Sequence, residues 1–366
     1  SFTVSMGSPD AGSIPDVSVD MPQWAKALTV GEWKEIPNSS LKLVPPTVTF
    51  TIGDTGPSSK IDAWTGLAID PLNSTVYSVA NGGHNDWPGN EVNAIVLSDE
   101  NPHWIERRAS SAQSQVVRDV DHYLDGTPTS RHSYYGVEFI APLRRVILLG
   151  GYMYGDGNFT RSFDAYDTIS NTYSHPYPNI PSSLAAAPGA PFVIDSTTSD
   201  IYGFGDYEVH RWNSSDNKWE QKLNSTPIYG FNSAAAFDSK RRRILIVGGD
   251  RSPSSSVGYA YDLTQNKLSP VTFTGESESV VDHQQAALIF VPAIDAYFYR
   301  NGTTAGASVY RIDAATMAIS KFTVQGGSGL PAPVNGLWKR WLYAPQLGGA
   351  VYVPAYDENV WFLRLH

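Results

Sequence analysis

The residues of this chain that are best suited to chemistry lie in three short motifs rich in histidine, arginine and aromatic side chains. Residues 82–91 read GGHNDWPGNE, residues 130–135 read SRHSYY, and residues 338–341 read WKRW. A histidine ring gains or loses a proton near neutral pH, and an arginine can bind a carboxylate through two parallel hydrogen bonds. Each motif also has a structural explanation, because acidic and amide side chains can hold a turn and indoles can pack between strands. The motifs indicate acid–base chemistry only if the fold brings them together.

The three motifs occupy loop positions of a unit that recurs along nearly the whole chain: residues 82–91 follow a second strand, whereas residues 130–135 and 338–341 lead into a first strand. In each copy a small or apolar run leads into a β-branched or aromatic run that often ends in Gly-Gly, and two further runs follow. Units of about 40–55 residues with four short strands are typical of a β-propeller. We therefore predict an all-β fold, a single β-propeller of about six four-stranded blades. The copies begin at residues 65, 135, 191, 233, 285 and 341.

The N-terminal part contains a strand that belongs to none of these copies. Residues 32–37 (EWKEIP) resemble the outer strand at residues 218–223 (KWEQKL), whereas the last copy ends after three strands. We predict that the N-terminal strand closes the C-terminal blade, which removes an exposed sheet edge. Residues 1–30 are expected to form an irregular N-terminal arm and residues 31–366 the propeller domain. Residues 108–131, the longest interruption, are expected to form a loop over one face.

The glycine pairs of the repeat carry a resemblance to a known family. Gly82-Gly83, Gly150-Gly151 and Gly248-Gly249 end second strands, and an aromatic residue lies downstream in each of these copies. This resembles the kelch-type repeat of the galactose-oxidase-like propellers over roughly residues 60–366. The resemblance implies the propeller fold, which hosts enzymes, binding modules and scaffolds alike. The copper oxidases of that group build their radical cofactor from a cross-linked tyrosine and cysteine, so their activity does not carry over to a chain without cysteine.

Composition excludes several classes of function. A net charge of −10 argues against nucleic acid as a partner, because phosphate binding needs a basic surface. The lack of cysteine excludes a thiolate nucleophile and cysteine-bound zinc. No run approaches the ~18 apolar residues of a membrane span, and residues 1–20 lack signal-peptide character. We expect no membrane insertion and an extracellular or virion-surface location rather than a cytoplasmic one, and the sequence leaves the oligomeric state open.

The register of the repeat predicts where the site lies. In a propeller, the loop entering the innermost strand and the loop between the second and third strands open on the same face. This places three of the eight histidines, His84, His132 and His283, at one mouth of the central channel. The catalytic candidates are His84, Arg131, His132 and Tyr134. The candidates for substrate binding are Asn85, Asp86, Trp87, Tyr152, His283, Arg300, Arg340 and Trp341.

These residue types suit β-elimination on the uronic acid units of an acidic polysaccharide. An arginine would pair with the carboxylate, one group would take the C5 proton, and another would protonate the leaving oxygen. Although the protein is acidic overall, we expect the predicted mouth to attract an acidic sugar through its local cations. Those cations are Arg131, Arg300, Lys339 and Arg340. The function predicted is a polysaccharide lyase that acts on a poly- or oligosaccharide without a cofactor.

Three alternatives stay open at this point. Two carboxylates, Asp86 or Glu91 with Asp250 or Asp282, could hydrolyse a glycosidic bond. His84, His132 and His283 could hold a metal ion, although ligands spread over three blades have no spacing signature. The same rim could bind glycans without catalysis, as a structural module of a cell surface or a virion appendage. Histidines that converge in one pocket would favour catalysis, whereas a flat aromatic rim would favour binding.

Overall fold

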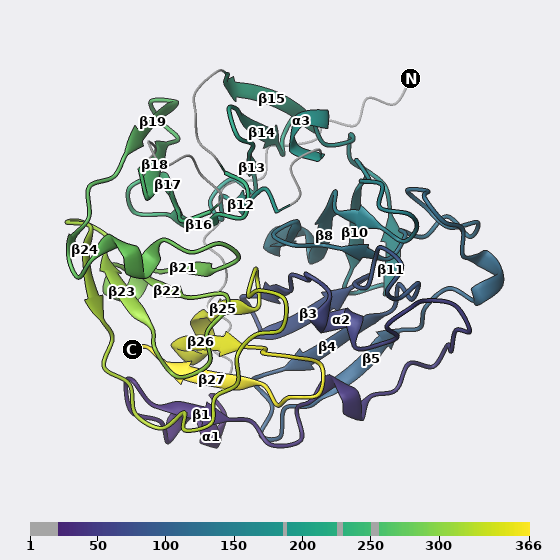
Figure 1. The fold of residues 1–366 in the computed structure, drawn as a ribbon, viewed down its shortest axis with the longest axis horizontal. Helices are drawn as coiled ribbons and strands as arrows, with labels where there is room; N and C mark the ends of the chain where they lie inside the picture. Colours follow the sequence, from purple (N-terminus) through teal and green to yellow (C-terminus); the bar gives the residue numbers. More distant parts are fainter. Residues whose placement is uncertain (1–20, 186–188, 225–229, 250–255) are drawn as a thin grey trace, which may run out of the picture.

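Six blades surround a central axis in the computed structural model, which describes residues 21–185, 189–224, 230–249 and 256–366 (Figure 1). Each blade has four antiparallel strands, and the innermost strands of the six blades are, in order around the ring, β2, β7, β12, β16, β21 and β25. The innermost strands of neighbouring blades contact each other all the way around the ring, from the last blade back to the first. The prediction of a six-bladed all-β propeller is therefore confirmed.

The strands follow the order of the repeat. Blade 1 contains β2 (Ala68–Asp70), β3 (Thr75–Val79), β4 (Val92–Val96) and β5 (Trp104–Arg108); blade 2 contains β7 (Val137–Ile140), β8 (Arg145–Leu149), β10 (Phe163–Asp167) and β11 (Thr172–Ser174); blade 3 contains β12 (Phe192–Ile194), β13 (Ile201–Phe204), β14 (Val209–Asn213) and β15 (Lys218–Leu223). Blade 4 contains β16 (Ala234–Asp238), β17 (Arg243–Val247), β18 (Gly258–Asp262) and β19 (Lys267–Pro270); blade 5 contains β21 (Ala287–Val291), β22 (Ala296–Arg300), β23 (Tyr310–Asp313) and β24 (Ala318–Lys321), with β20 (Thr274–Gly275) added in parallel; blade 6 contains β25 (Trp341–Ala344), β26 (Gly349–Tyr352), β27 (Trp361–Arg364) and β1 (Trp33–Glu35).

Helices are short throughout the described residues. They are α1 (Gln23–Lys26), α2 (Ser59–Asp62), α3 (Ser182–Ala185) and the 3-10 turns η1 (Leu41–Leu43), η2 (Gln113–Gln115), η3 (Ala141–Leu143), η4 (Glu278–Val281), η5 (Pro292–Ile294) and η6 (Pro345–Leu347). A helix able to cross a membrane is absent from the described ranges.

The second strand of a blade shows why these segments become strands. β8 reads RVILL and β17 reads RILIV, and in both only the leading arginine is not buried. A strand in the middle of a stack of sheets is covered on both faces, so its apolar residues run continuously instead of alternating. The hydrophobic core accordingly lies between neighbouring blades, as a series of apolar layers around the axis.

The N-terminal strand closes the ring, as the sequence predicted. β1 pairs antiparallel with β27, with Trp33 opposite Leu363 and Glu35 opposite Trp361. In Figure 1 the purple β1 lies beside the yellow β27, which joins the two ends of the described chain. Of the predicted arm, residues 1–20 lie outside the described residues. Residues 21–30 include α1, whose Trp24 packs edge-on against Phe362.

The backbone at the entry to the blades adopts an unusual conformation that repeats around the axis. A left-handed backbone costs free energy for residues other than glycine and often marks a functional position. Here it recurs at one repeat position and carries hydrogen bonds to the neighbouring blade, such as Tyr134 N to Trp64 O at 2.9 Å. It is therefore part of the propeller architecture. The residues are Trp64 (φ 49), Tyr134 (φ 49), Gly189 (φ 78), Asn232 (φ 59), Gln285 (φ 57) and Trp338 (φ 49).

Side chains fill the axis below this ring. The Tyr135 hydroxyl from the entry to blade 2 donates a hydrogen bond of 2.6 Å to Ala286 O at the entry to blade 5. The Lys339 ammonium is buried against the Glu138 carboxylate and donates to Phe192 O at 2.8 Å. The centre of the propeller is thus a packed core at this level.

Replacing Trp33 with alanine tests the closure. The indole is buried against Trp341, with ring centroids 5.7 Å apart, and the Arg300 guanidinium lies over it. We expect Trp33→Ala to lower the free energy of unfolding by about 3–5 kcal/mol through loss of this packing. Urea unfolding monitored by fluorescence measures the change. Lys34→Ala, at an exposed position of the same strand, is the control and should change stability by less than about 0.5 kcal/mol. Equal unfolding midpoints for the two variants would contradict this role of the strand.

Candidate functional site

Three short backbone segments bring two histidines and a tyrosine together beside blades 1 and 2. β6 (Arg131–His132) pairs antiparallel with β9 (Tyr152–Met153), so that His132 lies opposite Tyr152. The segment at His84 extends this small sheet, because His84 N donates to Met153 O at 3.1 Å. Three separate parts of the chain therefore meet through backbone hydrogen bonds.

Glycine is required where these segments meet. Gly83 has φ +57, and a Cβ atom there would lie 2.1 Å from His132 N. Gly151 has φ +101, and its Cβ would lie 2.4 Å from His132 O. Both the left-handed backbone and the close approach exclude larger residues. The Gly-Gly pairs of blades 1 and 2 thus allow the His132 backbone to lie between them.

Four aromatic rings converge as a result, and we call His84, His132, Tyr134 and Tyr152 the His–Tyr cluster. The ring centroids of His84 and His132 are 5.8 Å apart, and His84 and Tyr152 are also 5.8 Å apart. Tyr134 lies 6.1 Å from His132 and 6.2 Å from Tyr152. Trp64 covers the other side of His132 at 5.1 Å. The structure therefore brings four of the residues selected from the sequence into one group.

Asp86 anchors one side of the cluster. Its Oδ2 lies 2.9 Å from His132 Nε2, and its Oδ1 accepts a hydrogen bond of 2.5 Å from the Thr55 hydroxyl. Burial raises the pKa of Asp86, but the hydrogen bonds from His132 and Thr55 outweigh it and leave the pKa below its ordinary value. Asp86 is therefore a carboxylate at neutral pH.

Burial shifts the pKa values of the His132 imidazole and the Tyr134 hydroxyl in opposite directions. Burial lowers the pKa of His132 below its ordinary value despite the partly compensating Asp86 carboxylate, so the imidazole is neutral at pH 7. Burial raises the pKa of the Tyr134 hydroxyl far above its ordinary value, so it stays protonated. His84 is only half-buried, and its imidazole has no hydrogen-bond partner within the described ranges. The cluster combines an imidazole without a hydrogen-bond partner in the described ranges with a phenol that keeps its proton and can donate it in a hydrogen bond.

A small hollow of ≈ 20 Å³ adjoins the cluster between blades 2 and 3 and is open to solvent. Tyr134, Gly151 and Phe159 line it, and the Phe159 ring lies 3.8 Å from that of Tyr152. Small-molecule pockets commonly enclose about 300–1,000 Å³, so this hollow has room for about one water molecule and does not enclose a sugar unit.

The structure does not place Arg131 in this cluster, although it is adjacent to His132 in sequence. Its guanidinium is fully buried on the other side of the strand and donates to Asp164 Oδ2 at 2.8 Å and Gly150 O at 3.2 Å. Successive side chains of a strand point to opposite faces, so only one of the two neighbours can face the site. Arg131 is therefore not available to bind a substrate carboxylate.

The other predicted cations are also internal. The Arg300 side chain comes from blade 5 and is buried, and its guanidinium lies 4.3 Å from the ring centroid of Tyr352 in blade 6. The Arg340 guanidinium is fully buried and donates to backbone carbonyl groups, including Pro354 O at 2.6 Å. Lys339 is held by Glu138 in the axis, as described above. The expected local positive charge at the mouth cannot come from these side chains.

The remaining candidates divide between the site and the core. Asn85 is half-buried beside His84 and Asp86, whereas Trp87 is buried, with its ring 4.9 Å from that of Phe50. Trp341 lies in the core of blade 6. His283 precedes the innermost strand of blade 5, and its backbone lies against Gly248, so no contact joins it to His84 or His132 in the described part of the chain.

Of the carboxylates proposed for glycoside hydrolysis, Asp86 and Glu91 already have partners within the protein. Glu91 is buried, and its Oε1 lies 3.2 Å from Lys60 Nζ in a closed ion pair. Asp250 lies outside the described residues. Asp86, as shown, is held by His132 and Thr55.

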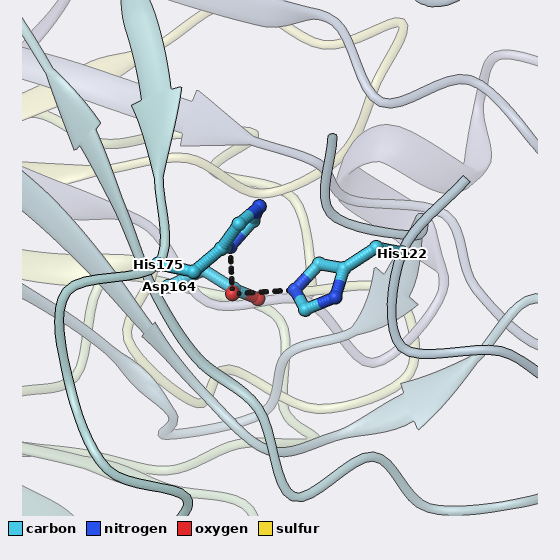
Figure 2. A group of neighbouring side chains, drawn as sticks. All are labelled: His122, Asp164 and His175. Atoms are coloured by element: carbon cyan, nitrogen blue, oxygen red, sulfur yellow. Dashed lines mark hydrogen bonds and ion pairs between the residues drawn. The ribbon is translucent and has the colours of Figure 1, made fainter. Parts of the chain in front are cut away.

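Sequence reasoning missed several residues of this face. Arg118 pairs with Asp156, and their side chains are 47% and 76% exposed. Asp156 belongs to the turn whose Gly155 N donates to His84 O, so Arg118 is a solvent-accessible cation near the cluster. It lies in the long interruption at residues 108–131, which has no counterpart in the repeat. A second group is formed by His122, Asp164 and His175 (Figure 2), and its Asp164 also binds Arg131.

Comparison with known proteins supports the fold. No protein-family model matches the sequence, and no curated protein matches it. The fold is similar to the solved structure of YjhT, with a TM-score of 0.51 and 12% sequence identity over 85% of this chain and 95% of that chain. A likeness at this identity shows a shared propeller fold and carries no activity with it.

Replacing Asp86 with asparagine tests the electrostatics of the cluster. The Asp86 carboxylate favours the protonated His132 ring against burial, so we expect Asp86→Asn to lower the pKa of His132 further. The folded-state pKa then lies further below the unfolded value of about 6.5, so the variant loses more stability than the wild type as the pH falls from about 7 to 5. NMR titration of the histidine rings measures the shift. Asp54→Asn is the control, because the Asp54 carboxylate has no hydrogen bond to either imidazole in the described ranges. An unchanged or higher titration midpoint for His132 in Asp86→Asn would contradict the assignment.

Proposed function

We propose that this protein is a carbohydrate-active propeller that cleaves an acidic polysaccharide by β-elimination at the His–Tyr cluster. The observation that carries the proposal is the combination of a free, half-buried imidazole with a phenol held in its protonated form. His84 supplies the first and Tyr134 the second, and both rings border His132. β-Elimination needs one group that accepts a proton and a second that donates one on the leaving side.

The proposed reaction assigns one proton transfer to each group. His84 takes the proton from C5 of a uronic acid unit, and the electron pair of that bond forms the double bond between C4 and C5. The bond from C4 to the glycosidic oxygen breaks, and the Tyr134 hydroxyl protonates the leaving oxygen. Proton return from the His84 imidazolium to the tyrosine through solvent restores the starting state.

His132 and Asp86 support the proton transfer to His84. A neutral His132 next to His84 adds no positive charge, so it does not oppose the formation of an imidazolium at His84. The Asp86 carboxylate interacts favourably with both rings and stabilises the charge that develops on His84. In this assignment His132 is a positioning residue that connects Asp86 to the base.

Recognition of the substrate carboxylate requires a cation at the surface. Arg118 supplies one, because its side chain is 47% exposed and its partner Asp156 is even more exposed. An ion pair with that exposure is weak, so a substrate carboxylate can replace Asp156 at little cost. The half-buried rings of Trp64, Tyr152 and Phe159 offer apolar faces on which sugar rings can stack.

In this proposal the glycine pairs that carry the kelch-type resemblance also build the site. Gly82-Gly83 and Gly150-Gly151 are the pairs that make blades 1 and 2 resemble kelch repeats, and Gly83 and Gly151 also enclose the His132 backbone. We infer that a kelch-type construction of these two blades holds the site.

One observation favours a second function, non-catalytic glycan binding by the same face. The arginines selected from the sequence are internal, so the mouth has less positive charge than a site built for polyanions usually has. The partly exposed aromatic rings alone would suffice for a glycan-binding or structural module. The two functions differ in whether His84 and Tyr134 transfer protons.

Activity measurements separate the two functions. The wild-type protein, incubated with a panel of uronic acid polysaccharides, should release products whose unsaturated ends absorb in the ultraviolet. We expect His84→Ala and Tyr134→Phe each to lower kcat by about 10²–10⁴-fold, since each removes one proton transfer. His103→Ala, at an exposed position remote in the repeat, should retain full activity.

Binding of the same polymers without unsaturated products would support the glycan-binding function and exclude the lyase. Product formation that survives both His84→Ala and Tyr134→Phe would show that the reaction uses other residues.

A further inference from the structure

Three side chains outside the His–Tyr cluster have the geometry of a metal site. Asp164 Oδ1 lies 2.9 Å from His122 Nε2 and 2.7 Å from His175 Nδ1. The three ligand atoms all lie within 4.8 Å of one another. In Figure 2 one ring nitrogen of each imidazole points at the same oxygen of the Asp164 carboxylate.

We propose that His122, Asp164 and His175 bind a divalent transition metal ion of the zinc class, which fastens the loop at residues 109–130 to the outer strands of blade 2. This site is independent of the proposed lyase activity, because none of its three ligands belongs to the His–Tyr cluster.

The hydrogen bond at the far side of His175 fixes one of its two ring nitrogens. His175 Nε2 lies 2.5 Å from Gly126 O. A carbonyl oxygen only accepts hydrogen bonds, so Nε2 carries a proton, and Nδ1, which lies 2.7 Å from Asp164 Oδ1, is the nitrogen that can bind a metal ion. A second backbone or carboxylate partner of this kind commonly fixes the tautomer of a metal-bound histidine.

The two imidazoles lie next to each other at the carboxylate. The ring centroids of His122 and His175 are 3.8 Å apart. A single dication shared by the two imidazoles and the one carboxylate would be bound by all three groups at once.

The surroundings of Asp164 leave one of its oxygens for the metal. Arg131 Nη2 at 2.8 Å and the Ser162 hydroxyl at 2.7 Å both donate to Oδ2, whereas both imidazoles face Oδ1. These contacts orient the carboxylate in the way that supporting residues orient metal ligands. Arg131 thus binds Oδ2 of the carboxylate and does not compete with a metal ion for Oδ1.

The spacing suits a small ion after a slight movement of the rings. A tetrahedral zinc ion with bonds of about 2.0–2.2 Å separates its ligand atoms by roughly 3.3 Å. The present separations are a few tenths of an ångström shorter, and the two imidazoles, with side chains 31% and 36% exposed, can move outward. That exposure also leaves the fourth position to solvent. Two imidazoles with one carboxylate favour zinc-class ions over calcium or magnesium, which prefer oxygen ligands alone.

Metal binding would connect the long loop between β5 and β6 to blade 2, a connection that the repeat itself does not provide. His122 and Gly126 belong to the long loop between β5 and β6, Asp164 lies in β10, and His175 follows β11. The same loop carries Arg118, whose partner Asp156 lies near His84. A metal ion would therefore hold the loop over the face that contains the His–Tyr cluster.

Metal binding by the full-length protein tests the proposal. After treatment with a chelator and its removal, the wild-type protein should bind one equivalent of Zn²⁺ in calorimetry, and its melting temperature should rise with Zn²⁺ but not with Ca²⁺. His122→Ala and His175→Ala should each weaken Zn²⁺ binding by at least ~10²-fold, and Co²⁺ in the wild-type protein should give visible bands that both variants lose. His103→Ala, an exposed histidine on another segment, should bind as the wild type does.

These variants are chosen because both imidazoles are partly exposed, whereas Asp164 holds Arg131 and is needed for folding. Three outcomes would overturn the proposal: no Zn²⁺ binding by the wild-type protein, equal binding by the wild type and both variants, or loss of binding in His103→Ala. The metal proposal and the lyase proposal can fail separately. Zn²⁺ binding by a protein without lyase activity would contradict only the lyase, and lyase activity without Zn²⁺ binding would contradict only the metal site.

Discussion

The ion pair between Arg131 and Asp164 is the constraint on which the rest of the site depends. Both side chains are almost fully buried, and their nearest atoms are 2.8 Å apart. Burial would raise the pKa of Asp164, but Arg131 and the hydrogen bonds from His122, His175 and Ser162 hold it well below its usual range. Removing one partner of such a pair leaves a buried charge uncompensated, at a cost of about 3–5 kcal/mol. The position of Arg131 is therefore strongly determined.

That position determines the geometry on both sides of blade 2. Because Arg131 points inward to Asp164, its neighbour His132 must point to the opposite side of β6, toward Tyr152 and His84. On the outer side, the same carboxylate presents its second oxygen to two imidazoles from different segments. One buried pair thus links the His–Tyr cluster to the histidine group behind it, so the loop at residues 109–130 and the site are parts of one connected structure.

The sequence predicted the fold well because its information is periodic. The repeat placed the strands of all six blades, and the unpaired Trp33 strand predicted the closure by β1 and β27. It also brought His84 and His132 to one face, since both lie at loop positions that the propeller geometry determines. It could not tell which way a side chain points within a short strand. For that reason the repeat places Arg131 and Arg300 at the mouth, whereas both are buried among internal partners. Arg340, just before β25, is buried as well because its guanidinium binds backbone carbonyl groups.

Non-periodic features could not be predicted in the same way. His122, Asp164 and His175 are separated by irregular intervals, and His122 lies in a loop without a counterpart in other blades. The access of Arg118 to solvent likewise depends on how that loop folds over blade 2. Contacts of this kind come from tertiary packing and have no signature in local spacing.

A crystal structure of Tyr134→Phe with a bound uronic acid oligosaccharide would test the central claim most directly, since the slow variant should retain its substrate. We expect C5 of one uronic acid unit to lie about 3–3.5 Å from a ring nitrogen of His84, with its carboxylate at Arg118 and the glycosidic oxygen beside the ring of residue 134. An oligosaccharide bound at another face, or stacked on Trp64 and Tyr152 with C5 turned away from His84, would contradict the assignment of this cluster as a catalytic site.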